Sequence, residues 1–383
     1  MPILNRAAEL QQEVTGWRRH LHSMPELGFG VDETAAFVAD KLRVFGCDEV
    51  VTGVGRTGVV GLICGRAGGH TVGLRADMDA LPICEETGLP WASKIPGRMH
   101  ACGHDGHTAM LLGAAKYLAE TRNFAGRVAV IFQPAEEDGG GGNEMVRDGL
   151  MERFGISRVF GMHSAPGLPV GHFALRPGPI MAETLEFVIT VEGKGGHAAR
   201  PHGTIDPIVI GSQIVSTLQT IVSRSVDPLD SLVVSVTKFQ AGAALNIIAG
   251  KAELAGTVRS LRKEVTAAGR ERIWTICKAQ AAAMGGHAEI EFIPSYPVTF
   301  NHAAETVLAG SVASRVAGAA NVDTNAAPEM FGEDFSYMLE ARPGAYIFLG
   351  NGDSTGLHNP AYDFNDEAIP YGISYWVQLA ETA

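Results

Sequence analysis

The spacing of apolar residues changes along the chain, and these changes predict its secondary structure. Residues 4–23 repeat apolar side chains at helical intervals, and a second helix is predicted for residues 33–45, with Asp32 as its N-cap. Between residues 49 and 75 the apolar stretches are instead short and separated by glycine, which favours strands. The chain is therefore predicted to begin with two helices followed by short strands.

Helices and strands are predicted to alternate over the next part of the chain. The apolar pattern predicts helices at 108–120 and 143–151 and strands at 127–133 and 158–162. This alternation is typical of an α/β protein in which helices pack against a central sheet.

A different order of elements begins near residue 181. The pattern predicts a strand, a helix, two strands, a helix and a strand, at residues 184–192, 206–226, 231–240, 251–260, 263–284 and 287–293. This β-α-β-β-α-β order is typical of a ferredoxin-like α+β domain. A chain of 383 residues is also long for one hydrophobic core. We therefore expect a discontinuous domain at 1–180 and 293–383, interrupted by an inserted domain at 181–292.

Two glycine-rich segments resemble nucleotide-binding loops. Residues 53–58 match the GxGxxG pattern, but the dinucleotide interpretation requires a helix to follow, whose N-terminus would face the pyrophosphate. A strand pattern follows at 59–63, so a hairpin turn is predicted instead. Residues 139–142 are four glycines without a following Lys-Ser/Thr, and we interpret them as a turn that passes close to a metal site.

Composition and charge narrow the possible partners and the compartment. The net charge is −12 and lysine and arginine do not cluster, which argues against a nucleic-acid partner. No apolar stretch reaches the ~18–20 residues needed to span a bilayer, and the N-terminus has no secretory signal pattern. Five scattered cysteines are not a disulfide framework. These features predict a cytoplasmic protein in which Cys102 is reduced.

Residues able to bind metal collect in loops and at strand ends of the predicted α/β domain. Cys102 and His104 flank a glycine just before a helix, Glu137 and His163 each follow a predicted strand, and His358 lies in a turn. Taken alone, each of these residues has an ordinary interpretation. A lone cysteine is more often a buried packing residue than a ligand, and the others could be surface residues. Together, a thiolate, three imidazoles and a carboxylate suit two metal ions.

Acidic residues near this set have possible supporting roles. Glu136 precedes Glu137 and is not needed as a ligand, so it could act as a base. Asp77 and Asp79 follow a strand at a spacing of two and would point the same way. Asp79 could orient a ligand histidine, or the pair could be turn carboxylates. We interpret His107, three residues past His104, as a packing residue or as support for a ligand.

Five longer motifs, taken together, resemble a known family. They are WRRHLH…PEL at residues 17–27, RADMDAL at 75–81, HACGHD at 100–105, QPAEE at 133–137 and GEDF at 332–335. In this order, over nearly the whole chain, they resemble the aminoacylase/carboxypeptidase metallopeptidase family. The resemblance is greatest to its amidohydrolase branch, which includes hippurate hydrolase and plant auxin-conjugate hydrolases.

The resemblance implies a fold and a set of metal ligands. It implies a zinc-peptidase-like catalytic domain, with a mixed central sheet flanked by helices, and an inserted ferredoxin-like lid domain through which the protein forms a homodimer. It implies two divalent metal ions per subunit, held by Cys102, His104, Glu137, His163 and His358. It also implies that Glu136 is the general base and Asp79 a supporting acid.

One departure from the wider family affects the choice of metal. Most of its members have His-x-Asp where this chain has Asp77-Met78-Asp79, and an aspartate bridging the metals where this chain has Cys102. The sulfur ligand is typical of the amidohydrolase branch. It leaves zinc, manganese, cobalt and nickel as candidates, because thiolate suits zinc whereas imidazole and carboxylate also bind the others.

The same resemblance assigns residues for the substrate. His197, on a glycine-rich turn, would reach the active site of the partner subunit and stabilise the oxyanion of the reaction. Asn246 and Arg259 are candidates for the substrate carboxylate, because a planar guanidinium suits a carboxylate. Arg259 could equally be a surface residue at a strand end. Gly332 is also assigned to substrate binding.

The function expected from these residues is hydrolysis of the amide bond of N-acyl amino acids, hippurate-like or N-acetylated. A metal-activated water would attack with Glu136 as base, releasing a carboxylic acid and a free amino acid. Alternatives within the family are a metallo-dipeptidase or aminopeptidase-like enzyme and an N-acetyl-diaminopimelate-type deacetylase.

Two alternatives belong to other classes of protein. A cysteine hydrolase would use Cys102 with His100 or His104, but it leaves the other three predicted ligands without roles. A non-catalytic metal-binding protein would have no need for Glu136.

Overall fold

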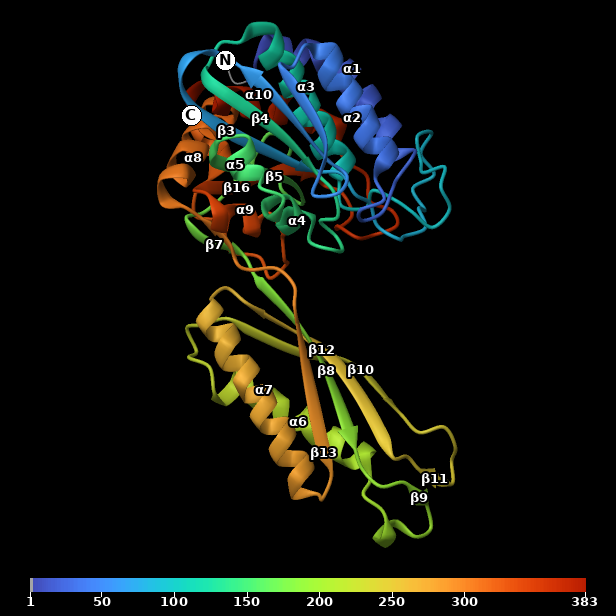
Figure 1. Ribbon diagram of the computed structural model, residues 1–383. Helices are drawn as coiled ribbons and strands as arrows, with labels where there is room; N and C mark the ends of the chain where they lie inside the picture. The colour runs from blue at the N-terminus through green and yellow to red at the C-terminus, as the bar shows by residue number, and fades with distance from the viewer. Residues whose placement is uncertain (1–2) are drawn as a thin grey trace. The chain divides into compact units, whose positions relative to one another are not determined.

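The computed structural model describes residues 3–383, apart from the side chain of Pro294. The chain forms two compact units (Figure 1). The first comprises Met1–Ile180, Thr299–Ala327 and Asp334–Ala383, and the second comprises Met181–Val298 and Pro328–Glu333. The chain thus leaves the first unit twice, and the short segment Pro328–Glu333 is not part of the 181–292 insertion that the sequence predicts.

The first unit is built on an eight-stranded mixed sheet. In sheet order its strands are β1 (Glu49–Val54), β2 (Gly58–Cys64), β4 (Ala125–Gln133), β3 (Arg66–Asp77), β5 (Ile156–Pro166), β16 (Gly344–Gly352), β6 (Phe173–Ala174) and β15 (Val322–Asp323). The four central strands β4, β3, β5 and β16 are parallel neighbours, whereas β1 and β2 are antiparallel to theirs. The predicted mixed sheet flanked by helices is confirmed.

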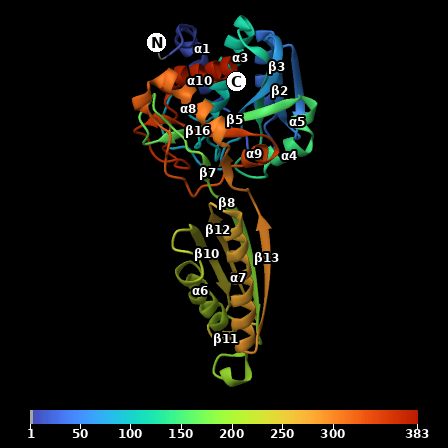
Figure 2. The same cartoon turned by 90° about the vertical axis from the view of Figure 1, so that its left-hand side faces the viewer.

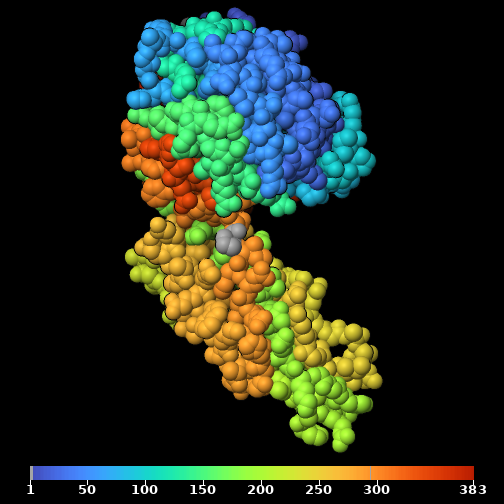
Figure 3. All heavy atoms as spheres, viewed as in Figure 1, coloured from blue at the N-terminus to red at the C-terminus, as the bar shows by residue number. Residues whose placement is uncertain are grey.

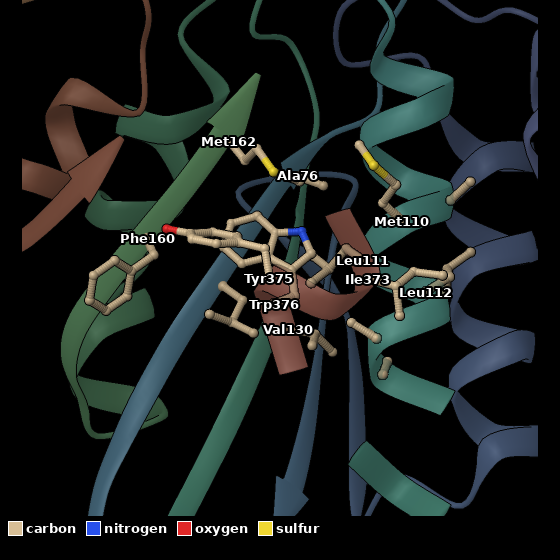
Figure 4. Packing of buried hydrophobic residues seen from close by; sticks show 14 of the residues in the cluster. Ala76, Met110, Leu111, Leu112, Val130, Phe160, Met162, Ile373, Tyr375 and Trp376 are labelled. Carbon is tan, nitrogen blue, oxygen red and sulfur yellow. The ribbon is translucent and has the colours of Figure 1, made fainter. Parts of the chain in front are cut away.

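Helices pack against this sheet (Figures 1 and 2). They are α1 (Asn5–His22), α2 (Asp32–Phe45), α3 (His104–Thr121), α4 (Gly141–Arg147), α5 (Leu150–Arg153), α8 (Ala303–Ala317), α9 (Ser336–Ala341) and α10 (Ile369–Thr382). Trp376 of α10 and Met110 of α3 are fully buried in the same core (Figure 4). A Cβ at Gly113 would lie 2.6 Å from Cδ1 of Ile373, so this glycine allows α3 and α10 to approach closely.

Three helix boundaries differ from the predicted ones. α2 begins at Asp32 and its N-cap is Val31, so Asp32 is inside the helix. α3 begins at His104 rather than at residue 108. Its first turn was missed because it is buried yet polar and therefore lacks an apolar pattern. The helix predicted at 143–151 is two helices, α4 and α5, separated by the left-handed backbone of Gly149.

The GxGxxG segment is a hairpin turn, as predicted. β1 and β2 are antiparallel, and Val54 lies opposite Gly58 in their register. Gly55 has a positive φ of 57°, and a Cβ there would lie within 3 Å of Met145, so the turn requires glycine for steric reasons. The surface of the first unit seen in Figure 3 is formed mostly by these N-terminal segments and those up to β5, coloured blue to green.

The second unit contains a four-stranded antiparallel sheet. Its elements are β8 (Glu183–Glu192), α6 (Pro207–Arg224), β10 (Leu232–Ala241), β12 (Lys251–Ser260), α7 (Lys263–Ala283) and β13 (His287–Pro294). The strand order is β10-β12-β8-β13, and α6 and α7 cover one face (Figures 1 and 2). A two-stranded ribbon joins β9 (Gly196–His197) to β11 (Ile247–Ile248). Within residues 3–383, no helix is long and apolar enough to cross a membrane.

Candidate metal centre

The predicted ligands converge at one edge of the first unit's sheet. The parallel strands β3 and β4 end there at Asp77 and Gln133, and β5 carries His163 near its end. The sequence placed His163 just beyond a strand, whereas it lies inside β5. Ligands of open α/β sheets bind at this edge because the loops that leave the strands meet there.

A glycine turn brings Cys102 and His104 to the same point. Gly103 between them has a positive φ of 89°, and a Cβ there would lie 2.6 Å from the Tyr362 hydroxyl. The Sγ atom of Cys102 is 3.3 Å from Nε2 of His163. The ligand atoms of Cys102, His104 and His163 all lie within 4.8 Å of one another, and all three residues are buried.

Glu137 and His358 complete the cluster. Nε2 of His358 lies 3.3 Å from Oε2 of Glu137, and both residues come within 4.8 Å of the Cys102 sulfur. The ligand atoms of His104, Glu136 and Glu137 also lie within 4.8 Å of one another. The structure therefore brings all five predicted ligands together, with Glu136 beside them.

The protonation of the histidines fits a metal centre. Nδ1 of His104 lies 2.8 Å from the main-chain oxygen of Asp79, and Nδ1 of His163 lies 2.7 Å from that of Ser164. A carbonyl oxygen only accepts, so each Nδ1 carries a proton and each Nε2 is left toward the cluster, where a metal ion can take the place of a second proton. Among the described residues, Nε2 of His104 and Oε1 of Glu137 are buried without a hydrogen-bond partner. The five side chains thus fit divalent ions.

The electrostatics of the cluster also favour cations. Burial lowers the pKa of His104, but the carboxylates of Asp77, Asp79 and Glu137 outweigh it and raise that pKa to about 10. Burial, together with Glu137 and Glu136, raises the pKa of the Cys102 thiol well above its ordinary value. A thiolate here requires a nearby positive charge, which argues against Cys102 as a nucleophile on its own.

Asp79 holds the turn that carries Glu136 and Glu137. Its two carboxylate oxygens accept the main-chain N–H groups of Glu136, at 2.9 Å, and of Glu137, at 3.1 Å. The sequence predicted that this carboxylate orients a ligand histidine. In the structure the main-chain oxygen of Asp79 does so, and the carboxylate lies 3.6 Å from Nδ1 of His104.

His107 contacts the site through Asp77 and Ser164. Its Nε2 accepts a hydrogen bond from the Ser164 main-chain N–H at 2.9 Å, so its Nδ1 donates to Asp77, at 2.7 Å. Asp77, His104 and His107 also have the spacing of a metal-binding group. Because both ring nitrogens of His107 already have partners, we assign it to the support of Asp77.

Sequence reasoning missed a buried charge cluster beneath the first turn of α3. His22 lies 2.8 Å from Asp105 and 3.3 Å from Glu85, and Arg18 is also buried beside Asp105. Burial lowers the pKa of His22, but Asp105 and Glu85 together outweigh it and raise the pKa to about 9. Asp105 directly follows His104, so the cluster anchors the residue next to a predicted ligand. Nothing in the local sequence pairs His22 with a residue this distant.

The four predicted substrate residues outside the first unit form two groups in the second. His197 and Asn246 lie together at the β9–β11 ribbon, where the Ala198 N–H donates to the main-chain oxygen of Asn246 at 3.0 Å. Arg259 lies opposite Thr184 of β8, and a Cβ at Gly332 would lie 2.4 Å from Thr184 Cγ2.

The two groups lie at opposite ends of the sheet of the second unit. The ribbon adjoins the Lys251 end of β12, because the Gly193 N–H donates to Gly250. Lys251 and Arg259 are eight residues apart on this strand, which at ~3.3 Å per residue separates the two groups by about 25 Å.

Known proteins resemble this chain over nearly its whole length. Residues 73–382 match the model of peptidase family M20/M25/M40. Hippurate hydrolase of Campylobacter jejuni is 43% identical over 380 residues, which cover 99% of each chain. N-acetylcysteine deacetylase of Bacillus subtilis is 40% identical over 364 residues, covering 95% of this chain and 94% of the relative.

Solved structures share the fold. A Bacillus subtilis protein described as a dinuclear metal-binding peptidase of the M20 family has a TM-score of 0.85 and 36% sequence identity. The match covers 97% of this chain and 98% of that one.

Proposed function

Because this chain belongs to peptidase family M20/M25/M40 and is an amidohydrolase, we propose that it cleaves the amide bond of N-acyl amino acids. The products would be a carboxylic acid and a free amino acid. The observation that carries the proposal is the convergence of five metal-binding side chains beside Glu136, each ligand atom within 4.8 Å of others in the set. The similarity to a hippurate hydrolase and to an N-acetylcysteine deacetylase supports this substrate class.

The five converging residues would hold the metal ions. Two divalent ions bound by Cys102, His104, Glu137, His163 and His358 would supply Lewis-acid polarisation of the amide and a water of lowered pKa. Zinc, manganese, cobalt and nickel all suit this mixture of sulfur, nitrogen and oxygen.

Glu136 would perform the proton transfers. It is buried and lies beside His104 and Glu137, and its main chain is fixed by Asp79. From this position its carboxylate takes a proton from the attacking water and passes it to the leaving amine. A carboxylate can fill both roles because the first transfer generates the acid that the second requires.

A homodimer would complete the substrate site. His197 and Arg259 lie about 25 Å apart along the sheet of one second unit, so both can contact one small substrate only if they come from two subunits. The edge strand β10 and the helix α6 offer a surface for such pairing. From Pro207 to Ser223, α6 has no charged residue, and Ile208 and Val209 are 40% and 50% exposed.

The role of Arg259 predicts that the enzyme requires a substrate carboxylate. Benzoylglycine should be cleaved about 10- to 100-fold faster, by kcat/KM, than benzoylglycinamide, because the amide loses a charge-assisted hydrogen bond. Release of glycine and of glycinamide from equal concentrations measures the ratio. Equal rates would remove Arg259 from carboxylate binding.

The same assay distinguishes the alternative functions. Faster cleavage of dipeptides with a free amine would favour the dipeptidase alternative. Faster cleavage of N-acetyl-diaminopimelate would favour the deacetylase alternative.

A further inference from the structure

Asp334, in the GEDF motif, is a fully buried carboxylate that the proposed reaction does not use. One oxygen accepts the main-chain N–H of Gly142 at 2.7 Å. The other accepts from the Gln133 amide at 2.6 Å and from the Arg75 guanidinium at 3.0 Å. We propose that Asp334 is a positioning residue that fixes the turn carrying Glu136 and Glu137. The inference rests on the proposed role of Glu136.

The turn is short and is held at both ends. β4 ends at Gln133 and α4 begins at Gly141, so residues 134–140 make the connection. Asp79 accepts two main-chain N–H groups in the first half of this connection. Asp334 accepts hydrogen bonds on both sides of the connection. The donors are the side chain of Gln133, just before the connection, and the main-chain N–H of Gly142, just after it. Two buried carboxylates therefore hold the connection that carries Glu136, Asp79 in its first half and Asp334 at its two ends.

Arg75 balances the charge of Asp334 and ties it to the strand ends. Its guanidinium donates to Asp334, to the Gln133 side chain at 2.8 Å and to Asp77 at 2.7 Å. All four side chains are fully buried. A buried ion pair of this kind is destabilising to break, because one charge is left without compensation. The pair thus holds the Asp334 carboxylate in one orientation.

The glycines after Glu137 fit this arrangement. A Cβ at Gly142 would lie 2.7 Å from the main-chain oxygen and 3.2 Å from Cγ of Asp334, and a Cβ at Gly141 would lie 1.7 Å from the Pro134 oxygen. The sequence interpreted residues 139–142 as a turn passing close to a metal site. The last two of these glycines instead begin α4, and they allow the backbone to pack against Asp334 and the turn.

Asp334→Asn tests the proposal because it keeps the shape and removes the charge. In the metal-free protein, we expect amide hydrogen exchange of peptides covering 134–142 to be about 10-fold faster, because the Gly142 N–H loses its strong acceptor. In the metal-loaded enzyme, we expect kcat to fall about 10- to 100-fold with little change in KM. Glu305→Gln is the matched control, because Glu305 is a buried carboxylate on α8 that lies 3.6 Å from Arg158 of β5, and it should change neither quantity.

A second variant covers the case in which Asp334→Asn does not fold. Gly142→Ala keeps every charge but places a methyl group against Asp334, and it should increase exchange and lower kcat in the same way. Wild-type exchange and wild-type kcat in the folded variants would overturn the positioning role. The proposed function has its own test: it is wrong if the wild-type protein releases no amino acid from N-acyl substrates. Even then, hydrogen exchange in the Asp334 variants shows whether Asp334 fixes the turn.

Discussion

Glu136→Gln is expected to lower kcat for N-acyl amino acid hydrolysis by about 10²- to 10⁴-fold, the usual contribution of a general base. Glutamine fills the same space, so the turn held by Asp79 stays in place, but the amide takes no proton from water. The measurement is kcat on benzoylglycine, together with metal content by mass spectrometry. Metal content should not change, because Glu136 is not one of the five predicted ligands.

Two further variants make the Glu136 result specific. Glu144, on the nearby helix α4, forms only long ion pairs, with Arg56 at 3.6 Å and with Arg147 at 4.0 Å, so Glu144→Gln should keep wild-type activity. Glu137→Gln should lose metal as well as activity, because that carboxylate faces His104 and His358. Wild-type kcat in Glu136→Gln would transfer the base role to another residue.

His197→Ala is expected to lower kcat by about 10²- to 10³-fold, as the loss of one oxyanion donor does in other hydrolases. His197 is exposed on the β9–β11 ribbon, so its removal should leave the fold and the metal content intact. The measurement is kcat on benzoylglycine with circular dichroism as the control for folding. Unchanged kcat would remove His197 from the reaction.

Mixing two inactive variants tests whether His197 acts on the other subunit. A dimer of one Glu136→Gln and one His197→Ala subunit would contain one intact site if His197 crosses the interface. If equal amounts of the two variants pair at random, half of the dimers are mixed and each has one intact site of two, so about a quarter of the wild-type activity should be recovered. If His197 acts within its own subunit, the mixture stays inactive.

The parts of the fold that the sequence predicts well are those encoded by neighbouring residues. The turn at 53–58 could be distinguished from a nucleotide loop because the strand pattern that follows is local. The start of α3 could not be found, because His104, Asp105 and His107 are polar and yet buried by partners elsewhere in the chain. Apolar periodicity carries no signal for a buried polar turn.

The candidate site shows the same division. Each of the five predicted ligands could be proposed from its place beside a strand end or in a turn, and the structure brings them together. The support of Glu136 could not be predicted, because Arg75 and Asp334 are 259 residues apart and are joined only by the fold. The main-chain contact of Asp79 with His104 also depends on backbone geometry that residue types do not specify.

The most direct test of a dinuclear metal amidohydrolase is metal titration of the chelated protein, with benzoylglycine hydrolysis followed at each step. We predict that removal of metal abolishes hydrolysis, and that zinc, manganese, cobalt or nickel restores it, reaching a plateau at about two ions per chain. Full hydrolysis by protein shown to contain no metal would contradict the account and return Cys102 to consideration as the nucleophile.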